Sequence, residues 1–255
     1  MTKYNKILFL LLLFVLLFVY IGIAKPNIPW STSSVAEQFT AQENKIAMYV
    51  ITMKREDRLQ NIKEQETKID RQITLVDAVK GNDLNEAELL KSGLLSQNYQ
   101  GQGGDVGKRE WGCYMSHFKI YEEIKSKQQE SDYSIIFEDD FSITTDNFIS
   151  KVNGAVELIK LKNVEFDMLY LGNTNDNHGE QVDENIYHVL QETPLWGTHA
   201  IVINNKNIDK IIGETNHINM AIDEKLKVLS MYNKLNILVL YPCIVIQNDS
   251  ASEIR

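Results

Sequence analysis

The pattern of apolar and polar positions divides the chain into three parts. Residues 7–24 form an almost uninterrupted run of Leu, Phe, Val and Ile, and residues 26–44 are mostly Ser, Thr, Pro, Gln and Glu. From residue 45 onward, short apolar runs alternate with stretches in which apolar residues recur at helical spacing. Short apolar runs are typical of strands covered on both faces, and the helical spacing is typical of helices that pack on a sheet. Residues 45–255 are therefore predicted to fold as one α/β domain.

The elements of this domain can be placed from the same pattern. Strands are predicted at residues 46–52, 72–79, 134–137, 166–171, 186–190, 197–203, 236–240 and 244–248. Helices are predicted at residues 54–66, 111–125, 146–160 and 206–212 and from residue 221 onward. Residues 81–107 are polar and glycine-rich, and they predict a mobile lid or connector with a short helix at residues 86–90. In open α/β sheets ligands bind beyond the carboxyl ends of the strands, so we expect a site there.

The apolar run near the start of the chain predicts a targeting segment. It is about as long as a helix that crosses the hydrocarbon layer, which favours an uncleaved signal anchor over residues 1–25 and a stalk over residues 26–44. Lys3 and Lys6 precede the run and predict a cytoplasmic N-terminus, with the domain on the lumenal or exterior side of a membrane. The small-x-small ending at residues 22–24 leaves secretion after signal cleavage as the alternative.

The composition of the chain limits the classes of molecule that it is expected to bind. The 255 residues carry a formal net charge of −9, which argues against a nucleic acid, because phosphate backbones are bound through an excess of Lys and Arg. Only Cys113 and Cys243 are present, and two cysteines in a chain of this length do not make a disulfide scaffold. Both are expected to be free thiols.

Candidate chemistry is concentrated where the apolar run at residues 134–137 ends in Glu138, Asp139 and Asp140. Neighbouring carboxylates repel one another unless a cation or hydrogen-bond donors offset the repulsion. Oxygen ligands of this kind suit Mg²⁺ or Mn²⁺, which commonly bind one or two carboxylates together with phosphate oxygens of a substrate. The alternative is a solvated acidic turn after a strand.

Four blocks, in order along the chain, resemble glycosyltransferase family 25, the lipooligosaccharide and collagen galactosyltransferase family. They are residues 50–58, the Gly-Cys-x-x-Ser-His block within residues 107–117, the Phe-Glu-Asp-Asp segment at residues 137–140, and a last block that runs from residues 197–198 through Asp223 to Pro242, Gln247 and residues 252–255. One departure lies at the first strand, where Thr52-Met53 replaces the Asn-Leu of the family pattern.

The resemblance implies a GT-A fold, a nucleotide-binding mixed sheet flanked by helices. It also implies inverting transfer of a sugar, most often galactose, from a UDP-sugar to a hydroxyl group of a glycan, glycolipid or glycosylated protein. Mn²⁺ or Mg²⁺ would be the cofactor, because it stabilises the charge that develops on a diphosphate leaving group.

The same resemblance assigns the acidic cluster. Asp140 is expected to be the main direct metal ligand, with Glu138 acting through water or on the ribose, and Asp139 remains ambiguous between the metal and the donor. Gln247 or Asn248 is expected to complete the metal site, and packing of the last strand is the competing explanation.

An inverting transfer also needs a base near the acceptor hydroxyl. Asp223 is expected to be that base, with Glu224 as the substitute candidate. Acids in the first turn of a helix also complement the helix dipole, which is the alternative reading of this pair. His117, within a predicted helix, is expected to pack or form a hydrogen bond rather than to react.

Donor contacts are expected at the first strand. Val50 and Thr52 are expected to meet the uridine, and Arg55 and Arg58 are the nearest cations for the phosphates. Both arginines could instead form ion pairs on a helix surface, which are common and weak.

Two other functions share some of these features. A metal-dependent nucleotidyl- or phosphotransferase would also have a nucleotide-binding sheet and an acidic strand, but a second metal would need further carboxylates close by. A membrane-anchored, catalytically inactive carbohydrate-binding protein is the other alternative, and the intact acidic strand argues against it.

Overall fold

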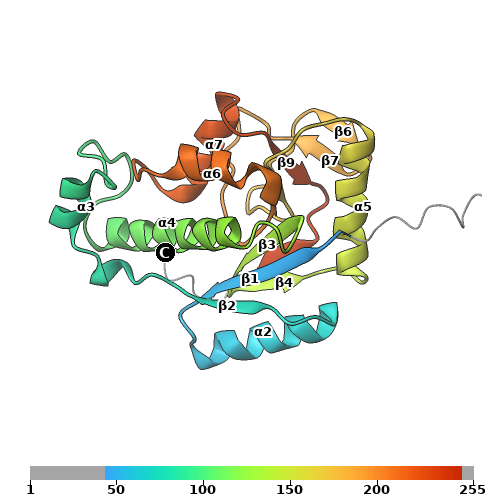
Figure 1. Cartoon of the computed structure of the whole chain (residues 1–255), viewed down its shortest axis with the longest axis horizontal. Coiled ribbons are helices and arrows are strands. Elements are labelled where there is room, and N and C mark those ends of the chain that lie inside the picture. The colour runs from blue at the N-terminus through green and yellow to red at the C-terminus, as the bar shows by residue number, and fades with distance from the viewer. Residues whose placement is uncertain (1–43, 249–255) are drawn as a thin grey trace, which may run out of the picture. The chain divides into compact units, whose positions relative to one another are not determined.

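A computed structural model describes residues 44–248, which are drawn in colour in Figure 1. The predicted anchor at residues 1–25 and all but the last residue of the predicted stalk lie outside the described residues, so membrane attachment and orientation stay predictions. Within residues 44–248 no helix combines the length and the apolar character needed to cross a membrane.

Strands and helices alternate along most of the described chain. The strands are β1 (Ile46–Thr52), β2 (Thr74–Asp77), β3 (Tyr133–Glu138), β4 (Phe141–Ile143), β5 (Met168–Tyr170), β6 (Gln181–Asp183), β7 (Ile186–His188), β8 (Ala200–Asn204), β9 (Ile237–Leu240) and β10 (Val245–Gln247). The α-helices are α2 (Glu56–Ile69), α3 (Glu86–Ser92), α4 (Gly104–Ser126), α5 (Phe148–Leu161), α6 (Ile208–Thr215) and α7 (Ile222–Met231). Short 3-10 turns lie at Gly81–Asp83 and Asn205–Asn207.

Eight of these strands form one mixed sheet in the order β2-β1-β3-β8-β5-β9-β7-β6. Strand β1 runs parallel to both β2 and β3, whereas β8 runs antiparallel to both β3 and β5. Strand β5 is parallel to β9, and the antiparallel pair β6 and β7 closes the far edge. The predicted α/β domain with a mixed sheet is therefore confirmed over the described residues.

Side chains alternate between two apolar layers on the two faces of the sheet. On β1, Tyr49 and Ile51 belong to the cluster that includes α4, α6 and α7, while Met48 and Val50 belong to the cluster that includes α2 and α5. Period-two alternation places successive strand residues on opposite faces, so each face buries an apolar layer under its own helices. Figure 1 shows α4 and α2 on opposite sides of β1 and β2.

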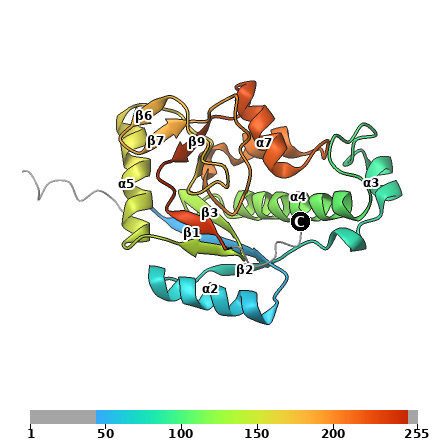
Figure 2. The ribbon, with the colours of Figure 1, turned by 180° about the vertical axis from the view of Figure 1, so that it is seen from behind.

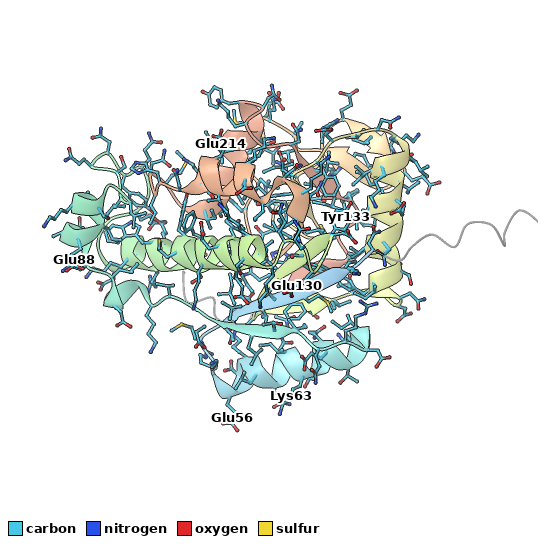
Figure 3. The ribbon with its side chains drawn as sticks, in the orientation of Figure 1. Glu56, Lys63, Glu88, Glu130, Tyr133 and Glu214 are labelled. Carbon is cyan, nitrogen blue, oxygen red and sulfur yellow. The ribbon has the colours of Figure 1, made fainter. Side chains whose placement is uncertain are left out.

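The outer face of α2 is polar. Glu56 and Lys63 are exposed on α2, and Figure 3 shows both side chains projecting away from the sheet. Helix α2 thus has the single apolar stripe typical of a helix that covers a sheet.

Three elements differ from the sequence-based prediction. Helix α4 begins at Gly104 rather than at residue 111, so the glycine-rich connector is shorter than predicted. Strand β6 lies in the polar segment between the strands predicted at residues 166–171 and 186–190, where no strand was predicted, and it pairs with β7. Strand β4 was not predicted, and it pairs antiparallel with β10 to form a second, two-stranded sheet. Figure 2, turned to the opposite side, shows β6 and β7 beside one end of α5.

Candidate active site

The three acids lie where strand β3 ends, next to the end of strand β1. The parallel register pairs Ile51 with Glu138, so the residues that follow both strands emerge at the same edge of the sheet. The backbone N–H of Met53 donates to Oδ2 of Asp139 at 3.3 Å. Because the chain continues past both strands at this edge, the acids face the loop after β1, as expected for an open α/β sheet.

Asp140 is the most buried of the three, with 6% of its surface exposed. Gln247 on β10 donates its side-chain N–H to Oδ2 of Asp140 at 2.9 Å. The other carboxylate oxygen, Oδ1, is buried and has no hydrogen-bond partner among residues 44–248. Burial, followed by the negative charge of Glu138, raises the pKa of Asp140 to about 6.

Arg58 lies beside the same acids. Its side chain is almost fully buried, with Nε 3.6 Å from Oδ1 of Asp139 and Nη1 4.0 Å from Oδ2 of Asp140. A buried cation beside neighbouring carboxylates offsets part of their mutual repulsion. Burial nevertheless raises the pKa of Asp139, against the lowering effects of its hydrogen bond with Thr52 and the charge of Arg58.

Glu138 is oriented by two neighbours. His117, completely buried in α4, places Nε2 3.2 Å from Oε1 of Glu138, and the hydroxyl of Thr198 donates to the same oxygen. Burial acts to raise the pKa of Glu138, but the interactions with His117 and Thr198 together outweigh it, so the net shift is downward. The prediction that His117 packs and forms a hydrogen bond is confirmed.

The Gly-Cys-x-x-Ser-His block fixes the loop after β2 against α4. The Ser116 hydroxyl accepts from the backbone N–H of Val79 at 2.8 Å and donates to the carbonyl of Gly112 at 2.7 Å. A Cβ atom at Gly112 would lie 2.6 Å from the carbonyl oxygen of Val79 and 2.7 Å from the nitrogen of Gly81. Only glycine allows this approach, which holds residues 79–81 beside the acidic cluster.

A first cavity of about 160 Å³ lies between the loops after β1 and β2 and helix α4. It is lined by all three acids and by residues that include Thr52, Arg55, Arg58, Lys80 and Arg109. The structure thus brings the two predicted arginines together with two further basic residues. The buried Nε of Arg109 has no hydrogen-bond partner in the described part of the chain.

Val50 is a correction to the sequence-based prediction. Its side chain has no exposed surface and belongs to the apolar cluster under α2 and α5, so it offers nothing to a ligand. The neighbouring Ile51 faces the opposite side of the sheet and lines the first cavity. The prediction failed because strand residues alternate between faces, and the sequence did not reveal which face carries the cavity.

A second cavity of about 480 Å³ lies on the other side of Glu138. Its lining includes Asp223, Glu224, Trp196 and Gln247. Cys113 and Glu138 line both cavities, so these two side chains mark the place where the cavities meet.

The two acids at the start of α7 have different surroundings. Asp223 is half-buried, and its Oδ1 accepts from the N–H of Glu224 at 2.9 Å. Burial raises the pKa of Asp223, while backbone hydrogen bonds from Glu224 and Gly197 partly oppose the shift. Glu224 is exposed, and its Oε1 accepts from the indole N–H of Trp196 at 3.0 Å. Asp223 is therefore the acid that is better shielded from water.

The oxygen atoms of the cluster fit a hard divalent cation. Asp140 contributes a buried oxygen without a protein partner, Glu138 lies at the junction of the cavities, and the Gln247 amide lies beside Asp140. Cys113, His117 and Glu138 also bring potential ligand atoms within 4.8 Å of one another. Burial raises the pKa of the Cys113 thiol, however, which favours the neutral form and makes it a poor ligand.

Four residues of the site were missed by reasoning from the sequence: Lys80, Arg109, Trp196 and Thr198. Lys80 and Arg109 reach the first cavity from the connector between β2 and α4 and from the early turns of α4, where charged residues are ordinary. Thr198 was part of a recognised block, but its role depends on the antiparallel pairing of β8 with β3, which the local pattern does not encode.

Several known proteins are similar to parts of this chain. The sequence profile described as "Glycosyltransferase family 25 (LPS biosynthesis protein)" matches residues 45–226. A probable inactive glycosyltransferase 25 family member 3 from Rattus norvegicus is 34% identical over 111 residues, which is 42% of this chain and 19% of that protein. Procollagen galactosyltransferase 1-B from Xenopus laevis is 29% identical over 61% of this chain and 24% of that protein.

Further matches extend over more of the chain at lower identity. Procollagen galactosyltransferase 2 from Homo sapiens is 24% identical over 82% of this chain and 34% of its own length. The chain thus spans about a fifth to a third of the length of these curated relatives. Among solved structures, apo UDP-glucose pyrophosphorylase overlaps with a TM-score of 0.39 at 10% identity, over 76% of this chain and 90% of that chain.

Proposed function

Because the chain belongs to glycosyltransferase family 25, we propose that it transfers a sugar from a UDP-sugar to an acceptor hydroxyl group, with inversion and with a bound Mn²⁺ or Mg²⁺. Galactose is the first donor sugar to test, because relatives that match much of the chain are named procollagen galactosyltransferases. The acceptor in this proposal is a glycan, glycolipid or glycosylated protein, and the domain is a GT-A fold.

The observation that carries the proposal is the pair of cavities that meet at Glu138. The first holds the acids and four basic side chains, a combination suited to a metal-bound diphosphate. The second holds a shielded carboxylate, Asp223, suited to take a proton. A transferase needs such an arrangement, with the donor and the acceptor on opposite sides of the bond that is exchanged.

The side chains of the first cavity have different roles in binding the donor. Asp140 and Glu138 would hold the cation, which when bound supplies charge neutralisation for the departing diphosphate. Gln247 fixes Asp140, and His117 and Thr198 fix Glu138, so both carboxylates are oriented before the donor binds.

Basic residues complete the donor site. Arg58 lies against Asp139 and Asp140, whereas Lys80 and Arg109 line the same cavity from the loop after β2 and from α4. We assign the diphosphate to Lys80 and Arg109, and to Arg58 the role of balancing the acids. Arg55 lines the same cavity but also pairs with Asp57 at 2.8 Å on the surface, so its contribution to phosphate binding is smaller.

In the second cavity, Asp223 accepts the proton of the acceptor hydroxyl as the oxygen attacks the sugar. Its partly buried position keeps the pKa above that of an exposed aspartate, which strengthens it as a base. Glu224 is exposed and holds the Trp196 indole, so it is the weaker candidate.

The test is release of UDP from a panel of UDP-sugars, with Mn²⁺ and with a chelator. One donor, with UDP-galactose first, should be turned over in the presence of the metal and not in its absence. Metal-independent release, or no release from any donor, would contradict the proposal. Formation of pyrophosphate from a sugar phosphate and UTP would favour a nucleotidyltransferase instead.

Placement on a membrane through residues 1–25 belongs to the same proposal, with the domain on the lumenal or exterior side. Protease protection of the domain in sealed vesicles, lost on addition of detergent, is the expected result for the full chain.

A further inference from the structure

The second cavity contains one large aromatic surface that packing of the core does not explain. Trp196 leaves 49% of its surface exposed while lining this cavity. A tryptophan buries a large apolar area when it is covered, so leaving half of it open to solvent forgoes stabilisation. Exposed aromatic rings inside a polar cavity are typical of ligand contacts.

Hydrogen bonds hold both the backbone and the indole ring of Trp196. The backbone N–H of Trp196 donates to Oδ1 of Asn175 at 3.1 Å, and its carbonyl accepts from the N–H of Thr174 at 3.0 Å. The indole N–H donates to Glu224 at 3.0 Å. Both the backbone and the ring of this exposed residue are therefore fixed before any ligand binds.

A buried asparagine braces the segment that carries Trp196. Asn177 is 1% exposed, and its side-chain amide donates to the carbonyls of Leu190, Thr193 and Pro194, while its side-chain oxygen accepts from the N–H of Leu190. This network ties two polar segments together next to the cavity. Preorganisation of this kind lowers the entropic cost of binding.

The two cavities differ in the charge of the side chains that line them. The first is lined by Arg55, Arg58, Lys80 and Arg109 in addition to its acids. The second is lined by four carboxylates, Glu110, Glu138, Asp223 and Glu224, and by no Lys or Arg among the described residues. An anionic ligand would be repelled from the second cavity, whereas a neutral polyhydroxyl ligand finds hydrogen-bond acceptors there.

The aromatic surface lies close to the proposed base. Gly197 follows Trp196 directly and donates its backbone N–H to Asp223, so the ring and the carboxylate belong to one connected wall. A sugar ring has an apolar face made of C–H groups and a polar rim of hydroxyls, which matches an indole face surrounded by carboxylates and by Gln102 and Thr174.

We propose that Trp196 is the platform of an acceptor subsite that takes the apolar face of a neutral pyranose and rejects acidic sugars. This inference rests on the proposed function and deepens it, because it assigns a substrate class to the second cavity. Trp196 acts as a specificity residue through stacking, and Glu224 positions the indole.

The experiment combines a binding measurement with kinetics. Saturation-transfer NMR of the full chain, in the presence of UDP and Mn²⁺, would use methyl β-galactoside, methyl β-glucoside and methyl β-glucuronide as probes. Wild type should give signals from at least one neutral glycoside and none from the glucuronide. The signals should be lost in Trp196→Ala, partly kept in Trp196→Phe, and unchanged in Tyr232→Ala, which removes an exposed aromatic ring on the surface at the end of α7.

Kinetics separates this subsite from the proposed activity. Trp196→Ala should raise the KM for a neutral acceptor about tenfold or more, whereas Tyr232→Ala should leave the KM for the acceptor and the KM for the donor within about twofold of wild type. Neutral-glycoside signals unchanged in Trp196→Ala, their absence in wild type, or equal binding of the glucuronide would each overturn the subsite. Absence of UDP release from every donor would instead overturn the proposed function and leave the NMR result to decide the subsite.

Discussion

The carboxylate of Asp140 combines deep burial with one oxygen that lacks a hydrogen-bond partner in the described structure. Asp140→Asn should lower kcat/KM for the UDP-sugar by about 100-fold or more, because it removes charge where a cation and a diphosphate would meet. Initial rates of UDP release over a range of Mn²⁺ concentrations would measure this. Asp209→Asn is the control, because Asp209 is exposed and pairs with Lys125 on the surface, away from both cavities. Wild-type rates in the Asp140 variant would exclude it as a metal ligand.

The two acids at the start of α7 can be told apart by matched amides. Asp223→Asn should reduce kcat by about two to four orders of magnitude with little change in the donor KM, since it removes a base and leaves the donor cavity intact. Glu224→Gln should reduce kcat only a few-fold and act mainly on the acceptor KM, because the Gln oxygen can still accept from Trp196. The opposite ranking would move the base to Glu224.

The basic residues missed in the sequence give a third test at this scale. Arg109→Ala should raise the donor KM and the inhibition constant of UDP about tenfold, because the guanidinium lines the first cavity with a buried, unpaired Nε in the described structure. Lys108→Ala, at the adjacent position outside this lining, should leave both constants within about twofold. Isothermal titration with UDP and Mn²⁺ would report the difference directly.

At the scale of elements, helix α4 connects the loop after β2 to the acidic strand. Gly112→Ala should destabilise the domain by about 1–3 kcal/mol, because its Cβ would meet backbone atoms of Val79 and Gly81 that cannot move aside cheaply. Gly154→Ala in α5 is the matched control, since its Cβ would meet nothing within 4 Å, and it should stabilise by about 0.5–1 kcal/mol. Urea unfolding of both variants would measure the change. Equal stability of the two would mean that α4 shifts to accommodate the methyl group.

Elements with strong apolar runs could be predicted from the sequence, and the pairing between distant elements could not. Strand β3 and its acids were placed correctly because three buried apolar residues, Ile135 to Phe137, directly precede three charges. Strand β4 was missed because its three residues gain their hydrogen bonds from β10, about a hundred positions later. The first turns of α4 were missed because Gly103, Gly104 and Gly107 read as a loop, while Gly107 instead allows close contact with the carbonyl of Gln102.

The same contrast between local pattern and long-range packing applies to the candidate site. Asp140, Glu138 and Gln247 were predicted together, and the structure brings them together, because the resemblance covers residues on both strands. Val50 was misassigned and Trp196 was overlooked. The face of the sheet to which a side chain points, and the fraction of it that is exposed, depend on packing rather than on residue type. Sequence thus predicted which chemical groups gather at the site, and the fold determined which of them reach the cavities.

For the whole molecule, the raised pKa of Asp140 links stability to pH. An unfolded aspartate has a pKa of about 3.9, whereas the pKa of Asp140 in the folded state is about 6. Between these two pH values Asp140 is protonated in the folded state and ionised in the unfolded state. The contribution of Asp140 to the free energy of unfolding is therefore fully present below about pH 4 and is lost as the pH rises through about 6. The loss is on the order of 3 kcal/mol.

Denaturant unfolding of the metal-free protein from pH 4.5 to pH 7.5 would measure this. Wild type should lose stability across the range, and Asp140→Asn should lose less and be the more stable protein at pH 7.5. Burial also raises the pKa of Asp139 and Asp223, so part of the slope should remain in the variant. An identical slope in both proteins would show that Asp140 does not carry the linkage.

The contact between β10 and the acidic strand has a consequence for how the protein is made. Gln247 and the backbone N–H of Asn248 both bind Asp140, across more than a hundred residues of chain. During translation the strand that bears the acids leaves the ribosome long before β10 does. The nascent chain can therefore bury most of its sheet while Asp140 still lacks these partners, and Asp140 gains them only after the segment around residue 247 has emerged and paired with β4.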